Sequence, residues 1–381
     1  MAGQLIQRGE RTWLVRVFIG RDSQTGKRRY HNHTVNGNKK DAQKYLNGVL
    51  RELDVGTFVE PSTTTVSEYL DRWLEAAAKP RLAELTFQHY EDLLRRYVRP
   101  AIGEAKLGSI RPLDVQGLYS GMLEANLSAR VVRYTHAVLN SAFRQAVKWR
   151  LMPQNPAAMV ELPKKDRKEM QALTPEQATA FLQAASDDRF RVLFNFALVT
   201  GMRPSEYLGL QWPDIDFETG VVAVVRTLTW THRGRWYYGE PKTSRSRRSI
   251  PLPSAMLALL KGHKREQGAE KLAAGAAYQS LGLVFCGREG QPIMPHNLIV
   301  RHFKPTLKRA GLPKSMRLYD LRHSCATLLL AGNENPKVVS ERLGHASITL
   351  TLDTYSHVLP SMQQAASDKL EKMLFSKTGT Q

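Results

Sequence analysis

Cysteine is scarce in this sequence. The 381 residues include only two cysteines, Cys286 and Cys325, which stand far apart and outside any CxxC pair or histidine spacing. A disulfide framework or a zinc site needs several cysteines or histidines at short spacings. We therefore expect two buried thiols, and no metal or disulfide held by them.

Long hydrophobic runs are also missing. No apolar run approaches the ~18 residues that a membrane-spanning helix requires. The opening residues, MAGQLIQRGER, contain no apolar signal core. These two absences predict a cytoplasmic protein without a membrane partner.

Acidic residues are few relative to basic ones. Lys and Arg total 55 against 35 for Asp and Glu, which gives a net charge of +20 and a pI near 10. Because counterion release favours polyanions, the expected partner is nucleic acid, and an anionic membrane surface is the less specific alternative. Hydrophobic residues still make up 42% of the chain, so a folded protein of two or three domains is expected.

The first segment, residues 1–60, is predicted to be a small β-sheet backed by a helix. Residues 12–19 (TWLVRVFI) alternate hydrophobic side chains on one face, and residues 28–35 (RRYHNHTV) supply a partner strand. Between them, GRDSQTGKRR lacks the spacing of a phosphate-binding loop, so it predicts a hairpin and no use of ATP. A helix follows, with Asn38 as its N-cap. Basic strands can enter a DNA groove, although a solvated basic face has the same composition.

The rest of the chain divides into a helical segment, a linker and a mixed segment. Residues 64–160 carry a series of amphipathic helices, the first of which begins at a Thr65/Glu68 capping box. Residues 161–171 are charged, contain proline and lack a hydrophobic period, which is typical of an exposed linker. Residues 172–381 are mostly helical, with three short strands predicted between residues 220 and 252, which indicates an α-rich α+β domain.

Cations recur in four separated stretches of the third segment. They lie in TGMRPSEYLGLQW, PKTSRSRRSIPL, LYDLRHSCATLL and LGHASITLTLDTYSH. Each stretch alone is weak evidence, because isolated arginines and histidines are usually solvated or structural. The tyrosine of the last stretch, Tyr355, has an equally ordinary interpretation as a half-buried aromatic anchored by its hydroxyl.

The order of these stretches closely resembles that of the tyrosine recombinases of the phage integrase type. The chain supplies a glycine turn with Arg203 and Glu206, then a lysine, an arginine followed by a histidine, an LGH turn and a tyrosine. The corresponding residues are Arg203, Lys242, Arg322, His345 and Tyr355. Several motifs in one order make chance agreement improbable. The resemblance implies a multidomain fold: a three-stranded N-terminal β-sheet plus helix, an all-α core-binding domain, and an α-rich α+β catalytic domain.

The chemistry of these residues agrees with breaking a DNA phosphodiester. Tyr355 can attack the phosphorus to form a phosphotyrosyl ester. The planar guanidinium groups of Arg203 and Arg322 can bind the phosphate oxygens and replace a metal ion. Lys242 can protonate the departing 5′ oxygen, and His345 can donate to the phosphate or help to move a proton. No cluster of carboxylates accompanies these cations, so a metal nuclease is disfavoured and no cofactor is expected.

One position departs from the family pattern. Tyr319 stands three residues before Arg322, where the family usually has a histidine. A phenol can donate one hydrogen bond but is a poor base near neutral pH. Tyr319 is therefore interpreted as a weaker phosphate donor, or else as an aromatic packed at the start of a helix. Glu206 is expected to orient the backbone around Arg203 and not to enter the chemistry.

The resemblance also implies how the protein acts in the cell. It implies strand exchange that integrates and excises a phage or another mobile element, by a homotetramer on double-stranded DNA in a bacterial host, associated with the nucleoid. The N-terminal sheet is assigned to arm att sites and the helical domain to core att sites, with excisionase and host DNA-bending proteins as further partners. A C-terminal helix around Leu370 and Leu374 is expected to dock on the next protomer. A type IB topoisomerase and a DNA-binding regulator on a weakened recombinase fold are the alternatives.

Overall fold

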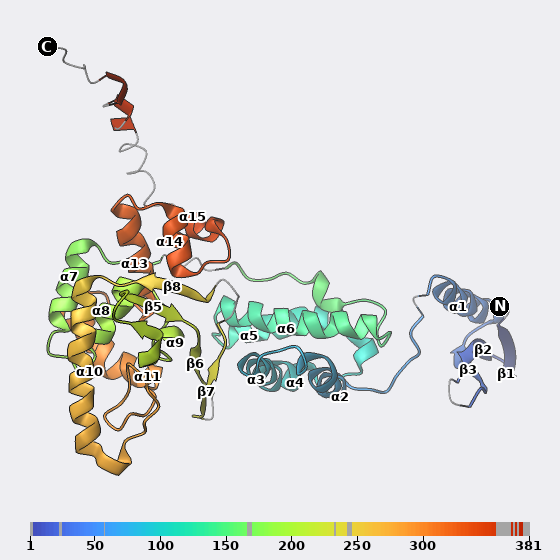
Figure 1. Cartoon of the computed structure of the whole chain (residues 1–381). Helices are drawn as coiled ribbons and strands as arrows, with labels where there is room; N and C mark the ends of the chain where they lie inside the picture. The colour runs from blue at the N-terminus through green and yellow to red at the C-terminus, as the bar shows by residue number, and fades with distance from the viewer. Residues whose placement is uncertain are drawn as a thin grey trace. The chain divides into compact units, whose positions relative to one another are not determined.

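The structure is a computed structural model that describes residues 3–22, 25–56, 58–165, 170–231, 234–241, 246–355, 367–368, 370–371 and 373–375. The chain divides into two compact units, Met1–Arg167 and Lys168–Gln381. Among the described residues, no helix is both long and apolar enough to cross a membrane. The elements of each unit are labelled in Figure 1.

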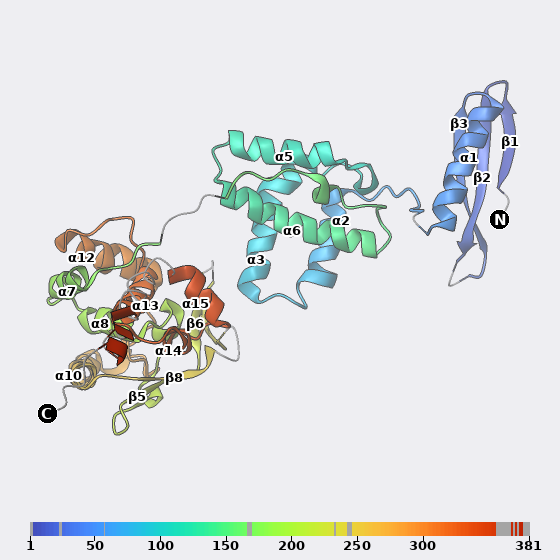
Figure 2. The same ribbon diagram turned by 90° about the horizontal axis from the view of Figure 1, so that it is seen from above.

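The N-terminal segment forms the predicted sheet and helix. Strands β1 (Gln4–Gly9), β2 (Thr12–Arg21) and β3 (Arg28–Asn36) make an antiparallel sheet in the order β1-β2-β3, and Arg21 pairs with Arg28 across the predicted hairpin. Helix α1 (Lys39–Asp54) packs on one face of this sheet, as Figure 2 shows from above. Its first turn is fixed by a capping box between Asn38 and Asp41, which confirms the predicted N-cap.

Helices make up the remainder of the first unit. The Thr65/Glu68 capping box that the sequence predicts is present at the start of α2. The buried Tyr69 and Trp73 follow on the apolar face of α2, and the Tyr69 hydroxyl donates to the carbonyl of Ala142, 2.6 Å away. The helices, with short 3-10 or π-helical segments labelled η, are α2 (Val66–Trp73), η1 (Leu74–Ala78), α3 (Glu84–Leu93), η2 (Leu94–Val98), α4 (Arg99–Ile102), η3 (Leu107–Ser109), α5 (Pro112–Glu124), α6 (Ala129–Lys148) and η4 (Pro156–Met159).

The second unit is an α-rich α+β domain. Its helices are α7 (Pro175–Ala184), α8 (Arg191–Thr200), α9 (Pro204–Tyr207), η5 (Trp212–Asp214), α10 (Ser254–Ala274), η7 (Gly275–Ala277), α11 (Pro295–Leu298), η8 (Ile299–Phe303), α12 (Lys304–Arg309), α13 (Asp320–Ala331), α14 (Pro336–Leu343) and α15 (Ile348–Tyr355). Its strands are β4 (Ile215–Asp216), β5 (Val221–Val224), β6 (Thr227–Trp230), β7 (Trp236–Gly239) and β8 (Arg248–Pro251). The sheets have the orders β4-β5-β8 and β6-β7.

The strand predicted over residues 220–230 is in fact two strands. β5 pairs with β4 and β8, whereas β6 pairs with β7. The break falls at Val225 and Arg226, where Arg226 forms an ion pair with the largely buried Asp214. The chain passes here from one sheet to the other, because the stretches on either side pair with different strands. The β-branched composition of this stretch predicts extended backbone but not this change of sheet.

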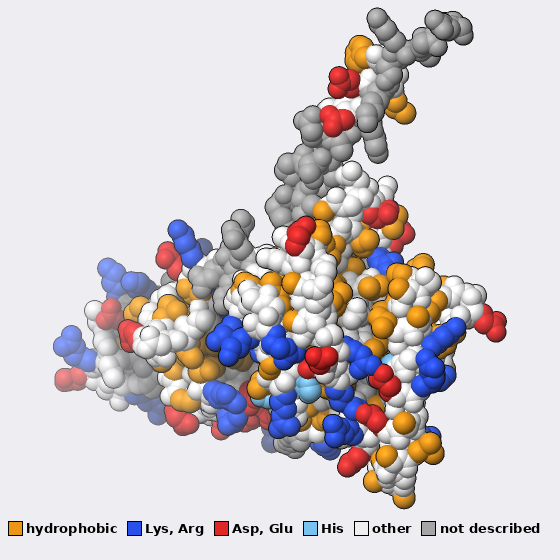
Figure 3. Space-filling view, turned by 90° about the vertical axis from the view of Figure 1, so that its left-hand side faces the viewer, with side chains coloured by type: hydrophobic (Ala, Val, Ile, Leu, Met, Phe, Trp, Pro, Cys, Tyr) orange, Lys and Arg blue, Asp and Glu red, His pale blue; other side chains and the backbone are white. Residues whose placement is uncertain are grey.

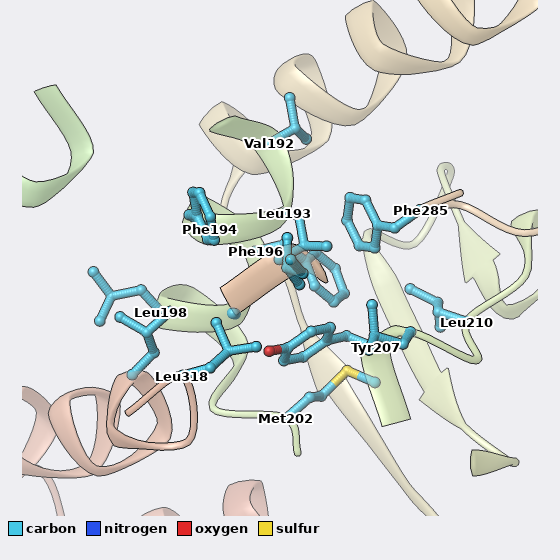
Figure 4. Close-up of a cluster of buried hydrophobic side chains, with 14 of the residues drawn as sticks. Val192, Leu193, Phe194, Phe196, Leu198, Met202, Tyr207, Leu210, Phe285 and Leu318 are labelled. Carbon is cyan, nitrogen blue, oxygen red and sulfur yellow. The ribbon is translucent and has the colours of Figure 1, made fainter. Parts of the chain in front are cut away.

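A hydrophobic core dominated by α8 positions the functional region of the second unit. Phe194 and Phe196 on α8 are fully buried, and Figure 4 shows them beside Met202 and Tyr207. Both cysteines are buried and free, as predicted. Helices α13, α14 and α15 gather at one end of this unit, next to β8 (Figure 1).

Candidate active site

A tight glycine turn brings Arg203 to the end of α8. Gly201 caps this helix with a left-handed backbone (φ 64°). A Cβ at Gly201 would lie 2.7 Å from Leu343 Cδ2 and 3.1 Å from Cys325 Sγ, which is too close for either neighbour. Glycine is therefore needed twice here, for its conformation and for the close approach of α13 and α14. Arg203 then becomes the N-cap of α9, directly after the buried Met202.

Glu206 holds two arginines at the same place. One carboxylate oxygen accepts from Arg203 Nη1 at 2.6 Å, and the other accepts from the Arg203 backbone N–H at 2.9 Å. Arg248 donates through Nη2 at 2.9 Å and through Nη1 at 3.3 Å. Burial alone would raise the pKa of the Glu206 carboxyl, but the hydrogen bond and charge of Arg248, together with Arg203, hold this pKa below its ordinary value. Glu206 is thus an ionised structural anchor, in line with the sequence interpretation.

Arg248 was not among the predicted site residues, yet it ties three of the motifs together. It lies at the start of β8, soon after the stretch that carries Lys242. Besides its bonds to Glu206, its Nε donates to the carbonyl of Arg342 at 2.6 Å, directly before the LGH turn. Only 7% of its side chain is exposed. The sequence could have indicated that Arg248 is buried, because residues two apart in a strand face the same side and Ile250 is fully buried.

Arg322 is a buried cation with an unused hydrogen-bond donor among the described residues. The residue is 2% exposed, and its Nη1 donates to the carbonyl of Gly201 at 2.8 Å. Its Nη2 is buried and has no hydrogen-bond partner among the described residues. Burial, and then the charge of Arg203, lower the pKa of its guanidinium to about 10, so it remains charged at neutral pH. A buried arginine in this state is prepared for an anion.

His345 follows a second left-handed glycine. Gly344 ends α14 with φ 68°, and the backbone N–H of His345 donates to the carbonyl of Ser340 at 3.0 Å. The Nδ1 atom of His345 lies 2.7 Å from Thr351 Oγ1, which fixes the ring. Arg203 Nη2 contacts the carbonyl of Gly344 at 3.4 Å, so the LGH turn lies against the Arg203 turn. Burial, followed by the charges of Arg322 and Arg203, lowers the pKa of His345 to about 4.

Tyr355 ends α15 inside a small hydrophobic cluster. It is 1% exposed and packs with Ala326, Leu330, Val339 and Leu343 from α13 and α14. Burial raises the pKa of its phenol, while the charge of Arg322 acts in the opposite direction. The packing that buries the Tyr355 ring also fixes the direction of its hydroxyl oxygen.

The hydroxyl of Tyr355 contacts a histidine that the sequence interpretation left without a role. His323 Nδ1 lies 2.9 Å from Tyr355 Oη. Tyr319, which departs from the family pattern, is the N-cap of α13 and is 37% exposed, and its ring stands edge-on to that of His323 with centroids 5.2 Å apart. Its position directly before the helix fits the packed aromatic as well as the phosphate donor. The sequence offered one signal for including His323 in the site, namely its position directly after Arg322.

Two further predictions concern residues and groups at this site. Lys242 lies outside the described residues, so its predicted role stays a prediction. Among the described residues, no group of three or more His, Cys, Asp or Glu side chains could hold a metal ion.

On the face shown in Figure 3, Lys and Arg are interspersed with Asp and Glu, as on an ordinary solvated surface. Arg203, Arg248 and Arg322 differ from these surface cations because they converge on one place and are partly or wholly buried.

Comparison with known proteins adds family and fold. Residues 171–362 match the model of the Phage integrase family, and residues 65–123 match the Phage integrase, N-terminal SAM-like domain. A tyrosine recombinase XerC-like protein of Caldanaerobacter subterraneus subsp. tengcongensis is 29% identical, with 97% of this chain and 98% of that protein covered.

Solved structures share the fold. The integrase of transposon Tn1549, in complex with transposon right end DNA, is 23% identical with a TM-score of 0.68, covering 81% of this chain and 99% of that chain. A lambda integrase tetramer bound to a Holliday junction is 20% identical with a TM-score of 0.58, covering 92% of this chain and 94% of that chain.

Proposed function

The chain belongs to the phage integrase family, and we propose that Tyr355 is its nucleophile and that Arg203 and Arg322 bind the scissile phosphate. The protein is a site-specific tyrosine recombinase that acts on DNA. The observation that carries the assignment is Arg322, a buried cation whose Nη2 lacks a partner among the described residues. A phosphate oxygen would supply that partner.

The reaction proceeds through a covalent protein–DNA ester. The Tyr355 oxygen attacks the phosphorus, the bond to the 5′ oxygen breaks, and a 3′-phosphotyrosyl linkage forms. Because the linkage keeps the energy of the broken bond, a 5′ hydroxyl from another duplex can reverse the step without ATP. Joining to a new duplex is what integrates or excises a mobile element.

The other residues of the site have separate roles in the reaction. Arg203 and Arg322 neutralise the charge that gathers on the non-bridging oxygens, and such preorganised charge stabilisation usually contributes more to the rate than any other single effect. His345 is neutral near pH 7. We assign its Nδ1 as the acceptor of the Thr351 hydroxyl, so that Nε2–H is the group that donates to the phosphate. Lys242 is the proposed acid for the departing 5′ oxygen, and Tyr319 is a secondary phosphate donor.

The larger assembly follows from the same proposal. A lambda integrase has been solved as a tetramer on a Holliday junction, and we assign the same stoichiometry to this chain. Residues 64–160 bind the core att sites and residues 1–60 the arm att sites, with residues 161–171 as the linker before the catalytic domain of residues 172–381. The exposed Leu370 and Leu374 would dock on the next protomer. Excisionase and host bending proteins would set direction in the bacterial cytoplasm, near the nucleoid.

A nicked duplex tests the nucleophile. The duplex carries the cognate crossover site, with a nick placed so that the cleaved fragment diffuses away and the covalent complex accumulates on a denaturing gel. Tyr355→Phe should abolish the covalent band and leave DNA retention on a native gel unchanged. A band that persists in this variant would place the nucleophile elsewhere. Retention of DNA without any wild-type band would instead indicate a binding protein without recombinase activity.

A further inference from the structure

The contact between His323 and Tyr355 has no place in the roles assigned above. The Nδ1 atom of His323 lies 2.9 Å from the oxygen that would attack the phosphate. We propose that His323 is the group that accepts the proton of Tyr355 during cleavage and returns it during resealing. This inference rests on the proposed function, because it assumes that Tyr355 is the nucleophile.

The geometry of α13 explains why His323 and not its neighbours has this access. Successive residues of a helix point about 100° apart, so Arg322 and His323 face different partners. Arg322 reaches back to the carbonyl of Gly201, whereas His323 faces the end of α15. Tyr319, one turn earlier, packs its ring edge-on against the ring of His323, with centroids 5.2 Å apart. Tyr319 thus supports the orientation of His323.

The other candidate bases are engaged or chemically unsuitable. His345 has its Nδ1 atom 2.7 Å from the Thr351 hydroxyl, and its Nε2–H is the group assigned above to the phosphate. Tyr319 is a neutral phenol and a poor base near neutral pH. Glu206 is fully committed to Arg203 and Arg248. The chain lacks the histidine that the family usually places at position 319, and His323 supplies an imidazole one helical turn later, in contact with the nucleophile itself.

The surroundings of His323 keep its ring neutral and ready to accept. Burial lowers its pKa to about 4; among nearby charges Asp320 raises the pKa, while Arg317 and Arg322 lower it. The uncharged Tyr319 and Tyr355 pack against it, and His345 is a further titratable neighbour. A neutral imidazole with its hydrogen on Nε2 presents a lone pair at Nδ1, as the contact with Tyr355 requires.

The proton transfer balances the cleavage step. As the bond from Tyr355 oxygen to phosphorus forms, the phenolic proton passes to His323 Nδ1 and gives an imidazolium ion. The bond from phosphorus to the 5′ oxygen breaks, and that oxygen takes its proton from the proposed acid, Lys242. In resealing, the incoming 5′ hydroxyl gives its proton to Lys242, which cleavage left neutral, and its oxygen bonds to phosphorus. The phosphotyrosyl bond breaks, and the imidazolium returns its proton to Tyr355.

The test measures the rate of covalent complex formation on the nicked duplex as a function of pH, in the full-length protein. His323→Gln keeps a hydrogen-bonding group but cannot act as a base, and His323→Ala removes the contact. At pH 7 we expect His323→Gln to be slower than wild type by about 10²-fold or more, the range for loss of a general base. Circular dichroism and DNA retention serve as controls for folding.

The pH profile separates proton transfer from simple positioning. Wild type should be nearly flat from pH 6 to 8.5, because His323 is already neutral there. His323→Gln should become faster by about tenfold per pH unit, because only the ionised phenol then reacts. The inference would be overturned if His323→Gln formed the covalent complex at the wild-type rate. It would also be overturned if this variant were slower but its rate, like that of wild type, did not change with pH. Absence of a covalent band in wild type would refute the proposed function instead.

Discussion

At the scale of single residues, the decisive feature is a buried charge without a complete set of partners. Arg322 makes one hydrogen bond to Gly201, and its second terminal nitrogen remains unpartnered within the described residues. Moving such a charged group out of water costs free energy, and its single side-chain hydrogen bond does not offset this cost. The cost is consistent with a residue that is retained for binding an anion and not for stability.

Substitution of Arg322 should have opposite effects on stability and on activity. Arg322→Met replaces the cation with an apolar side chain of similar length, so the melting temperature should stay the same or rise. Formation of the covalent complex should fall by about 10²-fold or more, since a preorganised charge at the phosphate is lost. Calorimetry and the nicked-duplex assay measure the two effects. A large drop in melting temperature would show that Arg322 is a structural residue.

The sequence allowed part of this site to be predicted. Four site residues each belong to a short motif, namely Arg203, Arg322, His345 and Tyr355. The motifs are stronger evidence together than singly, because they occur in one characteristic order. The partnerships of Arg248 and His323 join segments far apart in the chain, so local spacing does not reveal them. The buried state of Arg322 was likewise out of reach, since it depends on how α8 and α13 pack.

At the scale of elements, β8 links the motifs mechanically. Arg248 binds Glu206 from one side of the site and the carbonyl of Arg342 from the other. The strand therefore connects the segment that bears Lys242 to the turn that bears His345. Displacement of β8 would disturb the LGH turn together with Glu206, the partner that holds Arg203.

Arg248→Met is predicted to weaken both the fold and the reaction. Removing one partner of a buried ion pair lowers the free energy of unfolding by roughly 3–5 kcal/mol. Because Arg203 still pairs with Glu206 in this variant, we expect a loss near the lower value of that range. Cleavage should fall about tenfold or more at temperatures where the variant is folded, with DNA retention kept. Arg191→Met, which removes the exposed ion pair to Glu266, is the matched control and should change stability by about 0–1 kcal/mol. Equal behaviour of the two variants would contradict the role of Arg248.

Element prediction from sequence succeeded where a local signal exists. The N-cap at Asn38 and the capping box of Thr65 and Glu68 are present as the sequence predicts. The split of β5 from β6 escaped prediction, because local propensity describes extended backbone and not the strand with which each stretch pairs.

At the scale of the whole molecule, the net charge of +20 sets the strength of DNA binding. Contacts from Lys and Arg to phosphates release counterions, so the affinity for duplex DNA should fall steeply with salt. For six to ten such contacts, the association constant is expected to drop about 10³–10⁵-fold between 50 and 200 mM salt. Fluorescence anisotropy with a labelled duplex measures this slope. A nearly flat response would contradict binding through the basic surface.

The most direct test of the account is to identify the residue that becomes bonded to DNA. The wild-type complex trapped on the nicked duplex is digested with nuclease and trypsin, and the nucleotide-bearing peptide is identified by mass spectrometry. Cleavage after arginine and lysine places Tyr355 in the peptide of residues 343–369 and Tyr319 in that of residues 318–322. The account predicts the modification on Tyr355, in the first peptide alone. A nucleotide on Tyr319, or on any residue other than Tyr355, would contradict it.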